Sequence, residues 1–177
     1  MATYSASSER YSKPAIFFHW AVFLLVALAY LAIEVRGPKG SDSREFWSNV
    51  HFWAGTLVLA LAALRLLWRM WEGAPRDIDS NRLLTFLSRL VHVALYVFIV
   101  AQPLLGILTI NLGGKPVMLA GIDLQITLVG ADPVARKAVK AAHELIGNAF
   151  YWIIGIHALA AIAHHVMFRD NTLRRMI

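Results

Sequence analysis

Four long apolar stretches, separated by shorter polar segments, dominate the pattern of hydrophobic and polar residues in this sequence. They cover approximately residues 14–33, 46–68, 90–112 and 141–168. An α-helix rises about 1.5 Å per residue, so about twenty apolar residues are enough to cross the hydrocarbon core of a bilayer. The pattern therefore predicts an all-α fold: an integral membrane four-helix bundle that forms a single transmembrane domain over residues 1–177.

The composition supports a membrane protein and limits its chemistry. Hydrophobic residues make up 58% of the chain and charged residues 16%, which is too apolar for a soluble domain of this size. The N-terminal region lacks the pattern of a cleavable signal peptide, so we expect the first apolar stretch to be a span. Cysteine is absent, which excludes disulfides, cysteine-ligated iron–sulfur clusters and covalently attached c-type haem. Any redox centre must therefore be held non-covalently, and histidine is the obvious ligand.

The distribution of charge predicts membrane orientation rather than nucleic-acid binding. The net charge is +6, but the basic residues flank the apolar stretches and form no dense run typical of a nucleic-acid surface. If the N-terminus lies inside, ten lysines and arginines fall on the inner side: Arg10, Lys13, Arg65, Arg69, Arg76, Arg82, Arg89, Arg169, Arg174 and Arg175. The outer side then carries seven: Arg36, Lys39, Arg44, Lys115, Arg136, Lys137 and Lys140. We therefore expect both termini in the cytoplasm and the segment between the third and fourth spans outside.

Four histidines, His19, His51, His143 and His157, lie within the apolar stretches. Ionisable side chains inside a bilayer are costly and normally functional, and neutral imidazole commonly binds metals and haem iron. His143 and His157 are fourteen positions apart, so they share a helix face to within about 40° and lie about 21 Å apart along it. Because neighbouring spans run antiparallel, His19 matches the depth of His157 near the inner surface, and His51 matches His143 near the outer surface. The spacing predicts two stacked bis-histidine haems, whose irons these four side chains bind.

A glycine follows each histidine of the outer pair by four positions, Gly55 after His51 and Gly147 after His143. One helical turn along the same face, a missing side chain leaves space for a flat macrocycle; close helix packing is the alternative explanation. An interhelical hydrogen bond would explain the presence of any one histidine in an apolar stretch. It does not readily explain four histidines arranged as pairs at two depths. A zinc site is disfavoured because tetrahedral zinc needs three or four ligands together.

Two further residues could take part in the inner site. His92, in the third apolar stretch, is an alternative to His19 as a ligand; otherwise it is a packing or hydrogen-bonding residue. Arg65 lies in an apolar run and needs a counter-charge, for which a haem propionate is one candidate. Extension of its side chain to the inner headgroups is the other.

The sequence resembles the bacterial cytochrome b561 family of di-haem membrane cytochromes. The resemblance runs from Arg10 to Met176 and is carried by RYSKPAIFFHW, IEVRG, LRLLWR, HVALYVFIVAQPLLGIL and, most specifically, AHELIGNAFYWIIGIHALAAIAHHVMFRDNTLRRM. It implies a four-helix bundle in the bacterial inner membrane with two haems b, bound from the first, second and fourth spans. The positions that match the family's ligands are His19, His51, His143 and His157, in agreement with the spacing.

The resemblance implies an oxidoreductase. One branch of the family oxidises superoxide and passes the electrons to ubiquinone, and this sequence is most similar to that branch. An alternative is an electron-relay subunit that docks to a periplasmic dehydrogenase or hydrogenase. A third class, a transporter that relays protons through histidines, predicts a colourless protein.

His164 is the candidate residue for a quinone site. It follows His157 by seven positions, which places it on nearly the same helix face about 10 Å further toward the inner surface. An imidazole there is suited to hydrogen-bond a quinone carbonyl and to supply a proton as the quinone is reduced. The alternative is an interfacial histidine that faces lipid headgroups.

Arg136, Lys137 and Lys140 precede His143 by seven, six and three positions. They place positive charge at the outer mouth of the predicted bundle, where it would concentrate a small anionic electron donor such as superoxide. An ordinary solvated helix end is the alternative, since Asp132 and Glu144 partly offset the charge.

Overall fold

The structure is a computed structural model that describes residues 10–73, 82–119, 121–122, 124–167 and 169–177. Arg76, used in the orientation count, and Phe168, the expected end of the fourth span, lie outside these residues. The elements in chain order are α1 (Lys13–Val35), α2 (Asp42–Glu72), α3 (Arg82–Asn111), β1 (Val117–Leu119), β2 (Leu124–Ile126), α4 (Pro133–Val166) and a 3-10 turn, η1 (Leu173–Met176).

All four α-helices are long and apolar enough to span a membrane. Many of their large side chains point outward: Leu24 is 63% exposed, Leu145 71% and Trp152 77%. Such a surface would be unfavourable in water, but in a bilayer it faces lipid of similar polarity. The prediction of an all-α membrane bundle of four helices is therefore confirmed.

Three of the helices begin well before the apolar stretches that predicted them. α2 begins four residues, and α3 and α4 eight residues, before the predicted starts. Side chains at the helix ends explain two of these extensions. The Ser41 hydroxyl accepts from the backbone N–H of Arg44, and Asp132 accepts from the backbone N–H groups of Val134 and Ala135, which caps polar first turns.

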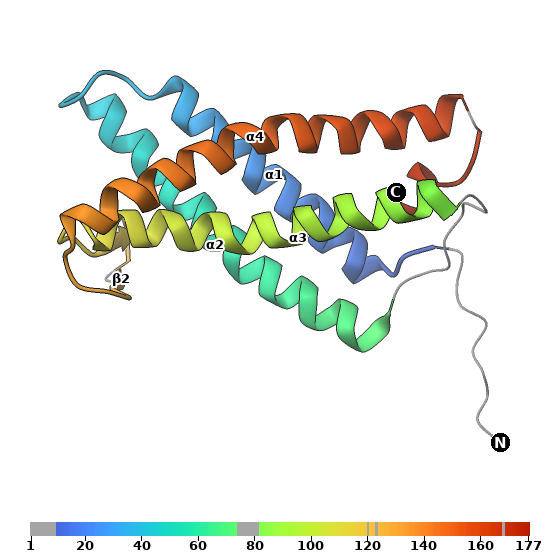
Figure 1. The fold of residues 1–177 in the computed structure, drawn as a ribbon, viewed down its shortest axis with the longest axis horizontal. Helices are drawn as coiled ribbons and strands as arrows, with labels where there is room; N and C mark the ends of the chain where they lie inside the picture. Colours follow the sequence, from blue (N-terminus) through green and yellow to red (C-terminus); the bar gives the residue numbers. More distant parts are fainter. Residues whose placement is uncertain (1–9, 74–81, 120, 123, 168) are drawn as a thin grey trace.

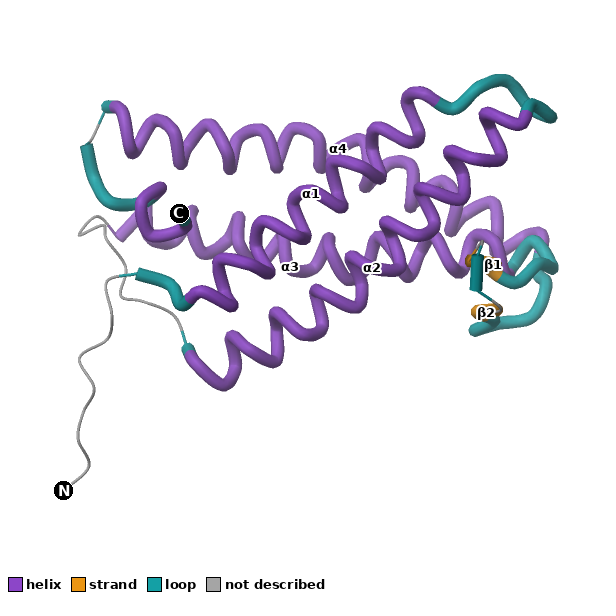
Figure 2. The backbone as a smooth tube through the Cα atoms, turned by 180° about the vertical axis from the view of Figure 1, so that it is seen from behind, coloured by secondary structure: helices purple, strands orange, loops and turns teal. Residues whose placement is uncertain are grey.

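The helices pack most closely as the pairs α1–α2, α2–α3 and α3–α4, and Figure 2 shows α1 crossing α4 in the bundle. At mid-depth, small and apolar side chains form the core: Val22, Val58, Ala62, Phe98 and Ile99. Phe98 of α3 stacks on Phe150 of α4, with ring centres 4.0 Å apart. Within the described residues, α1 and α4 meet through aromatic and histidine side chains rather than through close backbone packing.

One end of the bundle is covered by the antiparallel β1–β2 hairpin, which lies beside the α2–α3 side (Figure 2). Asn111, only 2% exposed, holds this segment in place. Its side-chain amide donates to the carbonyls of Lys115 and Ile126, and its side-chain oxygen accepts from the backbone N–H of Leu128. We call this the outer end, following the predicted orientation.

At the opposite, inner end, the C-terminal residues return to the start of α1 (Figure 1). The backbone N–H of Tyr11 donates to the carbonyl of Arg175, and the indole N–H of Trp20 donates to the carbonyl of Met176. Four membrane-spanning helices thus bring residues 10 and 177 to the same side. The lysine and arginine count predicts that this side is the cytoplasm.

Candidate functional site

In the structure, the two histidines of each depth-matched pair lie close to one another. The rings of His51 on α2 and His143 on α4 have centres 6.3 Å apart. The rings of His19 on α1 and His157 on α4 have centres 6.4 Å apart. α4 therefore contributes one histidine to each pair, and the stacked Phe98 and Phe150 belong to the core between them.

These separations fit a metal ion between the two rings of each pair. A metal–imidazole bond is about 2.0 Å long and the ring centre lies about 1.1 Å behind the bonding nitrogen, so two imidazoles on opposite sides of one iron have centres about 6.2 Å apart. A direct interhelical hydrogen bond between the rings would need a shorter nitrogen–nitrogen approach, and none links the two rings of either pair in the described residues. Among the described residues, no group of three or more candidate metal ligands is present.

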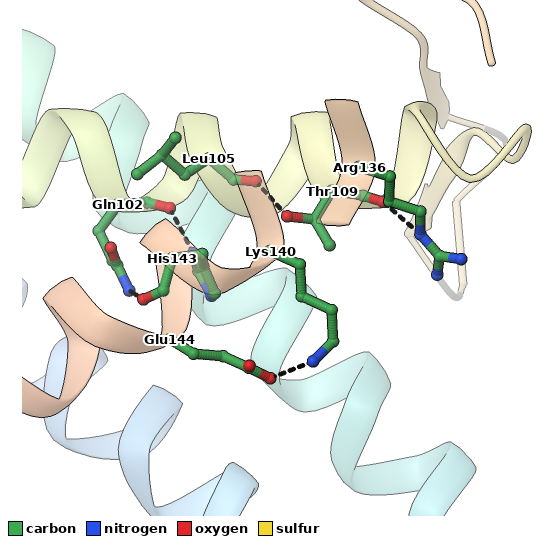
Figure 3. Close-up of polar contacts among 7 residues, drawn as sticks. All are labelled: Gln102, Leu105, Thr109, Arg136, Lys140, His143 and Glu144. Atoms are coloured by element: carbon green, nitrogen blue, oxygen red, sulfur yellow. Dashed lines mark hydrogen bonds and ion pairs between the residues drawn. The ribbon is translucent and has the colours of Figure 1, made fainter. Parts of the chain in front are cut away.

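Backbone carbonyls orient both rings of the outer pair. The Nδ1–H of His51 donates to the Ala29 carbonyl of α1 at 2.9 Å, and that of His143 donates to the Gln102 carbonyl of α3 at 3.1 Å. Figure 3 shows this contact and a second one, in which the Gln102 side-chain amide donates to the His143 carbonyl at 2.7 Å. With Nδ1 protonated, each ring offers Nε2 as the metal-binding atom.

The outer pair borders a cavity of about 690 Å³, part of it open to the surface, whose lining is mainly apolar. Gly55 and Gly106 are among the lining residues. A Cβ atom at Gly55 would meet nothing within 4 Å, whereas one at Gly106 would lie 3.3 Å from Cε1 of His143. Gly55 therefore borders open space, and Gly106 allows α3 to approach the His143 ring.

Gly147, the second glycine singled out in the sequence, has a different environment. A Cβ atom there would lie 2.9 Å from the side-chain nitrogen of Gln102, and the Gly147 carbonyl accepts from the Tyr30 hydroxyl at 2.7 Å. Gly147 therefore permits close packing of α4 against its neighbours. Gln102 and Tyr30 were not identified from the sequence, because their partners depend on how the helices pack.

The inner pair includes a third histidine. The ring centre of His92 on α3 lies 5.3 Å from that of His157, closer than His19 lies to His157. The Nδ1 atom of His19 is buried without a hydrogen-bond partner in the described residues. The Arg65 guanidinium interacts electrostatically with both His19 and His157 and lies 5.2 Å from the centre of the Tyr96 ring.

His164 forms a close contact that the sequence did not reveal. Its Nδ1 atom lies 2.6 Å from a carboxylate oxygen of Asp170, and the other oxygen of Asp170 accepts from the backbone N–H of Thr172. Partial burial raises the pKa of Asp170, but the hydrogen bonds from Thr172 and His164 outweigh it, so the pKa lies below its ordinary value of 3.8. In the sequence, the only indication of this contact is that an acidic residue follows His164 by six positions.

The basic residues at the outer end have unequal surroundings (Figure 3). The Arg136 side chain donates to the Thr109 carbonyl at 3.2 Å, and Lys140 forms an ion pair with Glu144. Lys137 is exposed. Some of the expected positive charge is thus engaged by neighbours, while all three residues stay on the turns of α4 that precede His143.

The sequence profile of the family described as prokaryotic cytochrome b561 matches residues 10–177. The chain belongs to this family. It is 34% identical to "Cytochrome b561 homolog 1" of Escherichia coli (strain K12), over 96% of this chain and 97% of that protein. It is 31% identical to "Probable superoxide oxidase CybB" of Yersinia pestis, over 96% of each chain.

Family membership confirms the coarser predictions drawn from the sequence. Proteins of the cytochrome b561 family bind b-type haem and transfer electrons within a membrane. With its four spanning helices, this chain is a multi-pass protein of the bacterial inner membrane.

Proposed function

We propose that this cytochrome is a superoxide:ubiquinone oxidoreductase that holds two haems b, one between His51 and His143 and one between His19 and His157. The observation that carries the two-haem proposal is the presence of two histidine pairs, each with a ring separation suited to one iron. Superoxide as the donor is supported by the 31% identity to the probable superoxide oxidase. We further propose that residues 1–177 form one domain with both termini in the cytoplasm.

Each bound haem supplies an iron that accepts and releases one electron at a time. The protein's part is to hold and shield these groups. The carbonyls of Ala29 and Gln102 fix the outer ligand rings, so little reorganisation accompanies a change of charge. Phe98 and Phe150 fill the core between the two pairs and exclude water there. In this proposal Arg65, beside the inner pair, would neutralise a haem propionate.

Electrons enter at the outer end. Lys137, Lys140 and Arg136 attract the superoxide anion, which releases one electron and becomes dioxygen. Two superoxide ions supply the two electrons that, with two protons, convert ubiquinone to ubiquinol. Because the donor reacts by simple electron loss, this end needs electrostatic attraction and access rather than an acid or a base.

Electrons leave at the inner end, near His164. The Asp170 carboxylate accepts from Nδ1 of His164, and in this proposal the imidazole lies beside the quinone. A hydrogen-bonded carboxylate and imidazole can hand a proton from one to the other, so the pair is suited to pass a proton from the aqueous side to the reduced quinone.

Stopped-flow mixing of oxidised, purified protein with superoxide tests the proposal. The haem bands should shift to the reduced form, and ubiquinone should reverse the shift. Lys137→Glu combined with Lys140→Glu should lower the rate of reduction about tenfold at low ionic strength, and the difference should shrink as salt rises. Lys13→Glu with Arg82→Glu makes the same change in net charge at the inner end and should leave the rate nearly unchanged.

Two results would argue against this function. If superoxide does not reduce the haem-loaded protein, an electron-relay subunit for a periplasmic redox protein becomes the better explanation. If both double variants slow reduction equally, the outer lysines have no special part in donor attraction.

A further inference from the structure

A basic pocket lies at the inner end, where the C-terminal residues fold against the start of α1. Its volume is about 720 Å³, part of it open to solvent, and it is lined by Arg10, Asn171, Arg174, Arg175 and Ile177. None of the residues that line the pocket has a part in the proposed electron transfer, although Asn171 directly follows Asp170.

The fold holds this pocket in shape through several contacts. Asp170 accepts from the Thr172 backbone N–H just before η1 and also contacts His164 on α4. The carbonyls of Arg175 and Met176 accept from Tyr11 and Trp20 of the α1 region. The arginines of the η1 turn are therefore carried on backbone that is fixed to two transmembrane helices.

Three of the five described residues that line the pocket are arginines. Arg10 donates to the backbone oxygen of Ile177, so at least one of its guanidinium N–H groups is already hydrogen-bonded. No aspartate or glutamate is among the lining residues in the described part of the chain. Two acids of this end are engaged elsewhere, Asp170 as above and Glu72 with Ser12 and Trp68.

We propose that this pocket binds the phosphate of an anionic phospholipid headgroup. Arginine presents a planar set of donors that matches phosphate oxygens, and the Asn171 amide adds further donors. The pocket lies where spanning helices end, at the depth of headgroups, and basic pockets at that depth bind anionic lipids. Trp20, Trp68 and Trp71 lie at the same end, as expected of aromatic residues at a membrane interface, and Trp71 is 78% exposed.

Lipid binding to the purified haem-loaded protein can be measured by native mass spectrometry in detergent. Phosphatidylglycerol should bind more tightly than phosphatidylcholine. Arg174→Gln with Arg175→Gln should weaken phosphatidylglycerol binding about tenfold, since each basic residue near a membrane surface contributes several-fold. The control Lys39→Gln with Lys115→Gln removes two exposed charges at the outer end and should leave binding within about twofold of wild type.

Three outcomes would overturn the proposal: equal loss in both double variants, no loss in the arginine variant, or displacement of the lipid by millimolar inorganic phosphate. The last result would assign the pocket to a soluble phosphate compound instead. If the double arginine variant does not fold, Arg174→Gln alone serves, because Arg174 is exposed. That single variant should weaken binding about threefold, and an unchanged affinity would reject the site.

Discussion

The two histidine pairs have nearly the same ring separation but very different surroundings. In the outer pair, backbone carbonyls of α1 and α3 fix both rings, and the α3 residues beside His143 are Gln102 and Gly106. In the inner pair, Nδ1 of His19 has no hydrogen-bond partner in the described residues, and His92 supplies a third ring.

If the histidines bind two haems as proposed, this difference predicts that the outer site is preorganised for one pair of ligands. In the inner site, either His19 or His92 could then bind together with His157. Hydrogen bonds to the far nitrogen of a ligand histidine fix its orientation and strengthen its binding, and losing them typically costs about ten- to a hundredfold in metal affinity. A site without them relies on the surrounding packing. The outer haem should therefore be the more sensitive to loss of a ligand and the inner haem the more tolerant.

Loss of an outer ligand should have the largest effect. We expect His51→Ala or His143→Ala to abolish the outer haem and largely spare the inner one, so haem per chain should fall from two to one. The haem content per chain, measured as the pyridine complex, checks this. Equal loss of both haems, or of neither, in either variant would show that the pairing is wrong.

The inner site should respond less strongly to the matching change. In His19→Ala, the ring of His92 is close enough to His157 to take its place, so the protein should keep most of its second haem with altered spectral bands. His19→Ala with His92→Ala should lose it, while His92→Ala alone should keep both haems. Complete loss of the second haem in His19→Ala would mean that His92 cannot act as a ligand. Neither site would then tolerate the loss of a ligand.

Filling the space beside the outer pair should have an intermediate effect on haem binding. Nothing lies within 4 Å of a Cβ atom built at Gly55 or at Gly155, but only Gly55 lines the outer cavity. If a macrocycle occupies that cavity, Gly55→Leu should weaken outer haem binding roughly tenfold, because overpacking costs about 1–3 kcal/mol. Gly155→Leu is the matched control. Equal haem affinity in the two variants would place the macrocycle elsewhere.

The sequence predicted the spans and the histidine pairs because both depend on regular helical spacing over long apolar stretches. Features that depend on contacts across the fold were missed. The outer hairpin is held by the buried Asn111, which in the sequence is only a polar residue at the end of an apolar stretch. Asp170 reaches His164 because Arg169 adopts a left-handed conformation with φ of 53°, which residues other than glycine rarely adopt and sequence patterns do not indicate.

The smallest effects should come from the contact between His164 and Asp170, just beyond the inner pair. His164→Phe should slow haem reoxidation by ubiquinone and leave the haem spectrum intact, and Asp170→Asn should slow it by about two- to threefold. Asp170→Asn should also lower the free energy of unfolding by up to about 1 kcal/mol near pH 7.

The pH dependence of this stability difference follows from the lowered pKa of Asp170. A carboxyl group whose pKa is lower in the folded state stabilises the fold above its ordinary pKa, and the stabilisation is lost as pH falls through the lowered value. The wild-type advantage over Asp170→Asn, measured by thermal melting, should therefore be complete at pH 5 to 7 and decline as pH falls from about 3.8, the ordinary value, through the lowered pKa. An advantage that stays constant as pH falls below 3.8 would show that Asp170 acts through its shape and not its charge. Unchanged reoxidation in His164→Phe would remove this end of α4 from the quinone site and leave the comparison of the two histidine pairs intact.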